Sequence, residues 1–324
     1  MPATLTGFSF APYFDVAVAS RIGVNGMAAR AENQDNVVVI DFDGRACMLR
    51  DGQPRHLTLA HWPAGHGRLA VLDGMGGHGH GREAAEAVAA ALLDVPPCDS
   101  LEELSARLDA VHADLQSRFA RGASGAARPG TTLTLLELRP GAAPLLYHVG
   151  DSRLYRLARD GATPLTVDHV PATVAALSGR IDADAWRAQV YGRHAPQIAQ
   201  AFILGNAFAD PARLSDPLFA LTASNLPPWL AHLPDRRLLP IEMDAAYLLA
   251  TDGFWSCAEP HRVTGRWPAL LDDCANAAML VDRLFAALES APPPGLQPDN
   301  LTALILRPLP RPTDETALPI NAEK

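Results

Sequence analysis

Apolar residues along the chain form short runs that stop at polar residues or glycine, a pattern typical of buried strands. NVVVIDF (36–42) and LAVLD (69–73) are two such runs, and AAYLLATD (245–252) and LTALILRP (301–308) are two more. Their continuous apolar character, without alternation, indicates strands that are covered on both faces. We therefore predict a β-rich core whose sheets are covered rather than open to water.

Turn residues between other apolar runs predict antiparallel pairing. ACML and HLTLAHW flank RDGQPR, which reads as a hairpin, and the segments 131–140, 144–151 and 153–161 read as an antiparallel meander. The pairs Asp43-Gly44, Asp51-Gly52 and Asp160-Gly161 lie between polar residues and are interpreted as hairpin turns.

Helical periodicity appears between these strands. We predict a helix over 82–93, which ends before Pro96 and Pro97, and a second over 100–120, with Ser100 and Glu103 as a capping box. Residues 171–204 read as mostly helical and 276–290 as a helix. Residues 205–240 carry six prolines and few clear patterns, so they are predicted to be a long irregular insertion.

Composition excludes several classes of protein. The 324 residues carry a net charge of −9 without a block of basic residues, which argues against a nucleic-acid partner. No apolar run is long enough to span a membrane, and no positive charge precedes Arg21, so we expect neither a membrane anchor nor a secretory signal. The four cysteines show no ligand spacing, which favours reduced thiols and a cytoplasmic location. The only lysine is Lys324, so a P-loop and Schiff-base chemistry are excluded.

The stretch GMGGHG (74–79) lies between a predicted strand and a predicted helix and formally matches a dinucleotide-binding fingerprint. Asp73 directly before it would repel a pyrophosphate, and Asp94, at roughly the spacing of the ribose-binding acid, follows a helix instead of a second strand. A dinucleotide-dependent oxidoreductase remains only as a minor alternative.

Five aspartates close or open the apolar runs. A carboxylate at the end of a buried strand is costly without a partner, and five are more than a single arginine could neutralise. Each one alone reads as a turn or cap residue, but as a set they favour a hard cation such as Mg²⁺ or Mn²⁺. The five are Asp35, Asp73, Asp151, Asp252 and Asp299.

Six short motifs occur in a fixed order: RAENQD, VLDGMGGH, GTT, GDSRLY, ATDG and PDN. Together they resemble the metal-dependent Ser/Thr protein phosphatases of the PPM, or protein phosphatase 2C, type in their bacterial form. The resemblance implies an α+β fold, a four-layer α/β/β/α sandwich in which helices flank two central antiparallel β-sheets. It implies a phosphatase domain over 1–306, with a flap and insertion at about 170–240. The composition of residues 307–324 predicts a disordered tail.

Site residues follow from the resemblance, motif by motif. Asp73 resembles the carboxylate that bridges two metals, Gly74 the carbonyl ligand, and Asp252 and Asp299 ligands of the first metal, while Asp35 stands in the acidic pair of the first motif. Asp151 resembles the ligand of a third, weaker metal, and Arg30 the arginine that holds the substrate phosphate. The implied cofactors are two tightly bound Mn²⁺ or Mg²⁺ ions, with a third held weakly.

The implied activity is hydrolysis of phosphoserine and phosphothreonine in proteins by a metal-activated water, with Arg30, Asp35 and Asp73 as the catalytic set. Partners would be phosphoproteins made by a cognate kinase, and we expect a monomer. The alternative is a catalytically weak, phosphatase-like regulatory module.

Three features depart from the family pattern. Met75 stands where eukaryotic members have a histidine, Gln34 replaces a carboxylate, and His78 and His80 lie in a glycine-rich loop where they are more simply solvated than catalytic.

Overall fold

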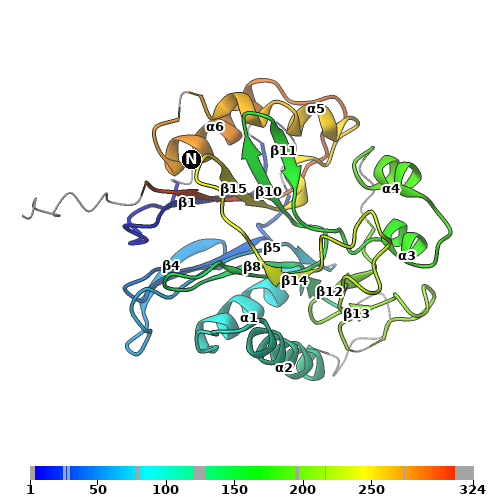
Figure 1. Ribbon diagram of the computed structural model, residues 1–324, viewed down its shortest axis with the longest axis horizontal. Helices are drawn as coiled ribbons and strands as arrows, with labels where there is room; N and C mark the ends of the chain where they lie inside the picture. Colours follow the sequence, from blue (N-terminus) through cyan, green and yellow to red (C-terminus); the bar gives the residue numbers. More distant parts are fainter. Residues whose placement is uncertain are drawn as a thin grey trace, which may run out of the picture.

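The computed structural model describes residues 4–24, 27, 30–76, 80–119, 128–193, 197–215, 217–272 and 274–310. Two antiparallel sheets stack face to face at its centre (Figure 1). The larger sheet has seven strands, in the order β14 (Arg236–Leu238), β9 (Leu145–Val149), β8 (Leu133–Leu138), β5 (Gly67–Leu72), β2 (Asn36–Ile40), β3 (Arg45–Arg50) and β4 (Gln53–Thr58). The smaller has five, in the order β1 (Phe14–Arg21), β16 (Leu301–Pro308), β15 (Ala246–Ala250), β10 (Arg153–Ala158) and β11 (Gly161–Pro164).

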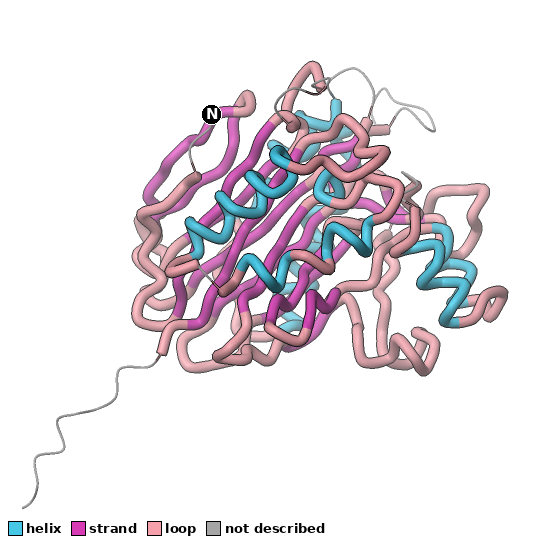
Figure 2. The backbone as a smooth tube through the Cα atoms, turned by 90° about the horizontal axis from the view of Figure 1, so that it is seen from above, coloured by secondary structure: helices cyan, strands magenta, loops and turns pink. Residues whose placement is uncertain are grey.

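Helices cover the outer face of each sheet. α1 (His80–Asp94) and α2 (Leu101–Phe119) lie against the seven-stranded sheet. α6 (Ala277–Ser290), with α5 (Pro260–Thr264) and the 3₁₀ segment η3 (Trp267–Leu270), lies over the five-stranded sheet, as the view from above shows (Figure 2). The four-layer α/β/β/α sandwich predicted from the motifs is confirmed.

Alternate residues of one strand enter two different cores, which explains the apolar runs. In β2, Val37 and Val39 point between the sheets, whereas Val38 and Ile40 pack beneath α1 and α2. Because side chains alternate along a strand, a strand covered on both faces must be apolar at every position.

The hairpin β3–β4 is confirmed and is tighter than predicted. Arg50 pairs with Gln53, which leaves Asp51 and Gly52 as the two turn residues, with φ of 51° and 69°. Positive φ at both positions suits a two-residue turn that matches the twist of the strands. Asp43 and Gly44 also lie in a turn, between β2 and β3, and Asp160 lies in the turn between β10 and β11, where Gly161 begins β11.

The predicted meander is only half right. β8 pairs with β9, but β10 lies in the other sheet, between β15 and β11. The segment 150–152 therefore crosses from one sheet to the other instead of making a tight turn within one. Both strands are almost fully buried, so their sequence patterns do not reveal which sheet each one joins.

Residues 167–235, called the flap here, form a small lobe with its own apolar core beside the sandwich. It holds α3 (Pro171–Leu177), α4 (Ala183–Val190) and the short strands β12 (Gln200–Ala201) and β13 (Gly205–Asn206). The helical prediction for 171–204 is wrong beyond α4, where the hairpin β12–β13 begins. Trp186 is buried at the centre of the lobe.

The remaining short elements are β6 (Gly74–Met75), β7 (Gly130–Thr131) and the 3₁₀ turn η2 (Asp252–Phe254). β1 was not predicted from the sequence. Of the tail expected over 307–324, residues 311–324 lie outside the described residues, and Arg307 and Pro308 still belong to β16. None of the helices described combines the length and apolar character that crossing a bilayer requires.

Candidate metal site at one edge of the sandwich

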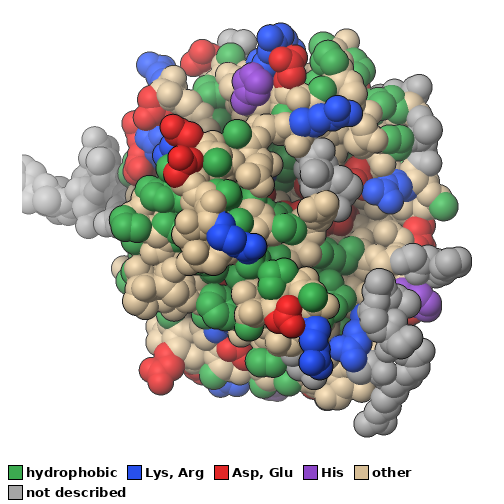
Figure 3. All heavy atoms as spheres, turned by 90° about the vertical axis from the view of Figure 1, so that its right-hand side faces the viewer, with side chains coloured by type: hydrophobic (Ala, Val, Ile, Leu, Met, Phe, Trp, Pro, Cys, Tyr) green, Lys and Arg blue, Asp and Glu red, His purple; other side chains and the backbone are tan. Residues whose placement is uncertain are grey.

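Strand register brings the five aspartates to one edge of the sandwich. Asp35 precedes β2 and Asp73 follows β5, and these strands are antiparallel with Asn36 opposite Leu72. In the other sheet the same geometry applies, because Ala250 of β15 lies opposite both Ala303 of β16 and Arg153 of β10. The residues next to these strand ends therefore gather at one edge, where the side chains lie on the flap side of the molecule. That face shows recessed acidic side chains (Figure 3).

Asp35 is buried and joins the two sheets. Its Oδ2 accepts hydrogen bonds from Thr302 Oγ1 at 2.7 Å and from Thr251 Oγ1 at 2.9 Å, and both threonines belong to the five-stranded sheet side. Burial raises the pKa of Asp35 to about 8, and the charges of Asp299 and Asp252 add to this, while the two threonine hydrogen bonds oppose it. Two hydroxyl groups therefore hold this carboxylate in position, and among the described residues no ion pair with a cation joins them.

Asp73 is the carboxylate that interacts with all the others. Burial raises its pKa well above the ordinary value, and the negative charges of Asp35, Asp252, Asp299 and Asp151 raise it further. Its backbone is fixed by Thr132, whose Oγ1 accepts from Asp73 N at 2.9 Å and whose N–H donates to Asp73 O at 2.9 Å. Asp73 lies at the electrostatic centre of the cluster.

Gly74 must be glycine for steric reasons. Its N–H donates to Gln34 O at 3.2 Å, and a Cβ at this position would come within 2.5 Å of the same oxygen and overlap the carbonyl of Gly81 in the first turn of α1. The backbone of the glycine-rich stretch therefore packs directly on the segment that carries Asp35. Because β5 is flanked by antiparallel neighbours, β2 and β8, the dinucleotide-binding interpretation of this stretch is excluded.

Arg30 lies at the mouth of the cluster and contacts it directly. Its Nη2 forms an ion pair with Asp299 Oδ1 at 2.8 Å, and its Nε donates to Pro298 O at 3.0 Å. Burial and the charge of Asp252 raise the pKa of Asp299, and Arg30 opposes that rise. Half of the Arg30 side chain remains exposed, and it lines a cavity of about 350 Å³ with Asp299, Ser256 and Arg193. The arginine predicted to hold phosphate is thus also a partner of one predicted metal ligand.

Several supporting residues were missed in the sequence. Asn300 Oδ1 accepts from Gln34 N at 2.8 Å, and its Nδ2 donates to the carbonyls of Ile22 and Glu32, which fixes the loop before Asp35. Thr251 and Asn300 lie within the motifs ATDG and PDN, and Thr302 lies two residues after PDN, so their proximity to the motif aspartates was the available signal.

The structure places three of the four residues that depart from the family pattern. Gln34 takes part through its backbone, while its side chain donates to Glu32 at 3.1 Å. Met75 lies in β6, paired with Gly130 of β7, and His80 starts α1 with an exposed contact to Glu83 at 3.4 Å. His78 lies outside the described residues.

The donor set fits a hard divalent cation chemically. Four carboxylates interact electrostatically with Asp73, and most of this charge is sheltered from water. Carboxylate and carbonyl oxygens are the ligands that Mg²⁺ and Mn²⁺ prefer. Within the described ranges, no three acidic, histidine or cysteine side chains converge closely enough to form a completed metal cluster. Strand register and the burial of these carboxylates, and not a closed ligand shell, therefore define the site.

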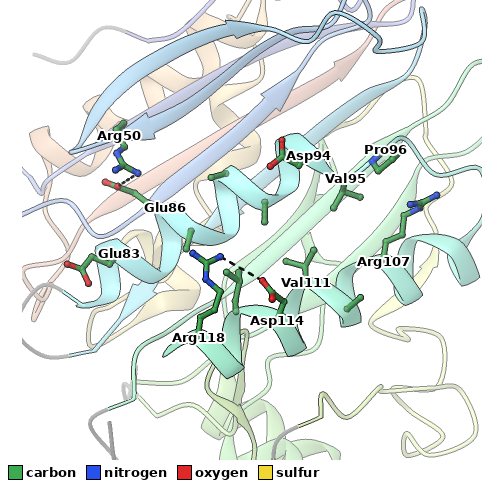
Figure 4. A pocket seen from close by; sticks show the side chains of 15 residues that line it. Arg50, Glu83, Glu86, Asp94, Val95, Pro96, Arg107, Val111, Asp114 and Arg118 are labelled. Atoms are coloured by element: carbon green, nitrogen blue, oxygen red, sulfur yellow. Dashed lines mark ion pairs between the residues drawn. The ribbon is translucent and has the colours of Figure 1, made fainter. Parts of the chain in front are cut away.

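A larger cavity lies away from these carboxylates. It measures about 920 Å³ and runs between α1 and α2, over an alanine-rich floor with Val111 and Leu115 (Figure 4). Ion pairs Arg50–Glu86 and Arg118–Asp114 border it, at 3.4 Å and 3.7 Å. It contains none of the five aspartates and is not part of the candidate site.

Comparison with known proteins identifies the fold. No family model matches the sequence. The serine/threonine protein phosphatase PstP of Mycobacterium tuberculosis is 40% identical over 124 residues, a match that covers 36% of this chain and 23% of the relative. The chain thus matches less than a quarter of the length of that curated relative.

Solved structures match over most of the chain. The M. tuberculosis phosphatase PstP/Ppp superimposes with a TM-score of 0.59 at 23% identity, over 92% of this chain and all of that one. The S. agalactiae serine/threonine phosphatase gives 0.62 at 19% identity, over 91% and 99%. MsPP of Mycobacterium smegmatis, a PPM Ser-Thr phosphatase, gives 0.54 at 22% identity, over 93% and 100%. The chain therefore has the fold of the PPM-type Ser/Thr phosphatases, as its six motifs predicted.

Proposed function

We propose that the chain is a metal-dependent protein phosphatase that hydrolyses phosphoserine and phosphothreonine. The observation that carries this proposal is the gathering of four other carboxylates around Asp73 at one edge of the sandwich, with Arg30 at the mouth. The PstP catalytic domain has been solved with two manganese ions and gives a TM-score of 0.56 at 22% identity, which supports a similar metal requirement here.

Asp35, Asp73, Asp252 and Asp299, with the carbonyl of Gly74, would hold two Mn²⁺ or Mg²⁺ ions, and Asp151 a third, weaker one. When bound, such ions activate water at neutral pH and neutralise charge on the phosphoryl group. The threonine pair Thr251 and Thr302 keeps Asp35 oriented, and Thr132 fixes the backbone of Asp73. The protein thus supplies a preorganised array of negative charge that does not have to reorganise during the reaction.

Arg30 would orient the substrate phosphate. A guanidinium presents its donors in a planar fork that matches phosphate oxygens. Because Arg30 is half exposed and already contacts Asp299, it can reach an incoming anion while remaining attached to the site. Its role in positioning substrate is therefore coupled to the ligand Asp299.

The alternative, a phosphatase-like module without turnover, has no support in the site residues. Such a module is expected to have lost at least one of Asp73, Asp252 and Asp299, and all three are present and lie at the same edge. Targets would be phosphorylated proteins made by a cognate kinase.

Phosphate release from a phosphothreonine peptide tests the proposal. We expect release with Mn²⁺ or Mg²⁺, none after exhaustive chelation, and none from Asp73→Asn. Asp94→Asn, an exposed aspartate at the end of α1, is the matched control and should keep full activity. Undiminished turnover after chelation would overturn the metal-dependent assignment.

A further inference from the structure

Arg153 is a buried cation at the junction between the flap and the candidate site. It is the first residue of β10, two positions after Asp151, and only 2% of it is exposed. A buried guanidinium needs partners for its charge and for its five N–H groups. The identity of those partners shows which segments it joins.

The flap supplies the counter-charge. Arg153 Nε donates to both carboxylate oxygens of Asp168, at 2.9 Å and 3.0 Å, and Nη2 donates to Asp168 Oδ2 at 2.6 Å. Nη2 also donates to the carbonyl of Val190, the last residue of α4, at 2.8 Å. One side chain therefore joins the crossover segment 150–152 to both ends of the helical part of the flap.

Two aromatic rings enclose the same guanidinium. Its carbon lies 4.8 Å from the ring centre of Tyr191, directly after α4, and 4.7 Å from that of Trp255. Trp255 follows η2, which begins with Asp252. Arg153 thus contacts the flap on one side and, on the other, the segments that carry the predicted ligands Asp151 and Asp252.

The residues on either side of Asp151 are also fixed. Gly150 exchanges two hydrogen bonds with His169 of the flap: His169 N donates to Gly150 O at 2.8 Å, and Gly150 N donates to His169 Nδ1 at 3.2 Å. Ser152 Oγ lies 2.6 Å from Thr132 Oγ1, the hydroxyl that accepts from Asp73 N. Asp151 therefore lies between a contact to the flap and a contact to the Asp73 backbone.

A cavity of about 330 Å³ opens beside Asp151 between these elements. Asp151 and Arg153 line it together with Val170 and Pro171, at the start of α3, and Val190 and Arg193, at the end of α4. The predicted weak metal ligand thus faces the flap directly.

We propose that Arg153 is a positioning residue that couples the flap to Asp151, so that the third, weak cation site is complete only while the flap is packed against Arg153. The flap cannot move away from Arg153 without leaving a buried charge unpaired or displacing the crossover segment. Protein substrates that touch the flap would then act on turnover through Asp151. This inference rests on the proposed phosphatase function.

The test compares Asp168→Asn and Arg153→Lys with Asp160→Asn as matched control. Asp160 lies in the turn after β10 and pairs with Arg156 of that strand; its own side chain is 70% exposed, and the pair does not touch the flap. Two readouts are needed: hydrogen–deuterium exchange of the peptide spanning 148–153, and the Mn²⁺ dependence of hydrolysis of p-nitrophenyl phosphate, which is too small to use the flap.

In Asp168→Asn and Arg153→Lys we expect faster hydrogen exchange over 148–153 and a lower kcat on p-nitrophenyl phosphate. The Mn²⁺ concentration that gives half of the maximal rate should rise about 10- to 100-fold, the usual effect of losing a residue that orients a metal ligand. Tight Mn²⁺ binding should persist, and Asp160→Asn should behave as wild type. If Asp168→Asn does not fold, Tyr191→Leu keeps the ion pair, removes one ring, and should shift both readouts in the same direction by less.

Two outcomes would overturn the proposal. In the first, the variants unfold at a lower temperature while kcat per folded molecule and the Mn²⁺ dependence stay unchanged. The contacts of Arg153 with the flap would then be only structural. In the second, KM rises for a phosphopeptide alone, so the flap only binds substrate. If the wild type hydrolyses neither substrate, the proposed function fails. The exchange data still test the coupling between the flap and Asp151, because unchanged exchange over 148–153 in the two variants contradicts that coupling.

Discussion

The acidic edge and the flap are built by different means. At the edge, Asp35, Asp73 and Asp252 adjoin strands whose antiparallel register places them together, and the surrounding cores on both sides of the sheets are large. The flap has a small core of its own and is joined to the sandwich by the side chains of Arg153 and His169 and by short backbone contacts, among them the two hydrogen bonds between Thr131 and Phe202. Strand register therefore brings the carboxylates to the edge, whereas single side chains and short backbone bridges set the position of the flap.

The largest effect is expected at the centre of the edge. Asp73→Asn removes the charge that interacts with the other four carboxylates, so it should reduce phosphate release to background. Unfolding should not become easier, because loss of that charge also relieves repulsion among buried carboxylates. Thermal unfolding and phosphate release should be measured on the same sample. Wild-type turnover in this variant would remove Asp73 from the site.

Gly74→Ala tests whether the edge tolerates displacement of its backbone. The added Cβ overlaps the Gly81 carbonyl and approaches Gln34 O, and neither backbone group can move freely. We expect the free energy of unfolding to fall by about 1–3 kcal/mol, as for overpacked cores, together with loss of tight Mn²⁺ binding. Gly141→Ala is a useful control, since its φ of 65° is strained for alanine but no atom lies within 4 Å of the added Cβ. It should lose stability and keep its metal affinity.

Thr302→Val tests whether the five-stranded sheet orients Asp35. The variant removes the 2.7 Å hydrogen bond to Asp35 and keeps the shape of the side chain. Mn²⁺ affinity measured by calorimetry should fall about 10- to 100-fold, because the carboxylate loses an orienting partner. Thr163→Val, on the exposed side of β11, should leave the affinity unchanged. An unchanged affinity in Thr302→Val would mean that Asp35 does not contact the metal.

The same contrast explains what the sequence could reveal. Asp73 and Asp252 were identified because each ends an apolar run, and the hairpin at Asp51-Gly52 was identified from its turn residues. The partners of Arg153 lie 15 and 37 positions further along the chain, and no pattern in the sequence pairs them with it. Contacts of that kind depend on tertiary packing, which also placed β10 in the second sheet and β12 after α4.

The smallest effect is expected within the flap. Asp182 caps α4 by accepting from Ala185 N at 2.9 Å, so Asp182→Ala should destabilise that helix by about 1 kcal/mol. Hydrogen exchange should rise over 183–190, while tight Mn²⁺ binding stays as in the wild type. A change in tight Mn²⁺ affinity would show that the stability of α4 affects the metal site at the edge of the sandwich.

The stoichiometry of tight Mn²⁺ binding tests the central claim most directly, that register-aligned carboxylates form the metal site. Electron paramagnetic resonance can count free Mn²⁺ during titration of the wild type and of Asp73→Asn. We predict two tight ions in the wild type and the loss of at least one in Asp73→Asn. If the wild type binds no Mn²⁺ tightly, or if Asp73→Asn binds the same number with the same affinity, the assignment of the acidic edge is wrong.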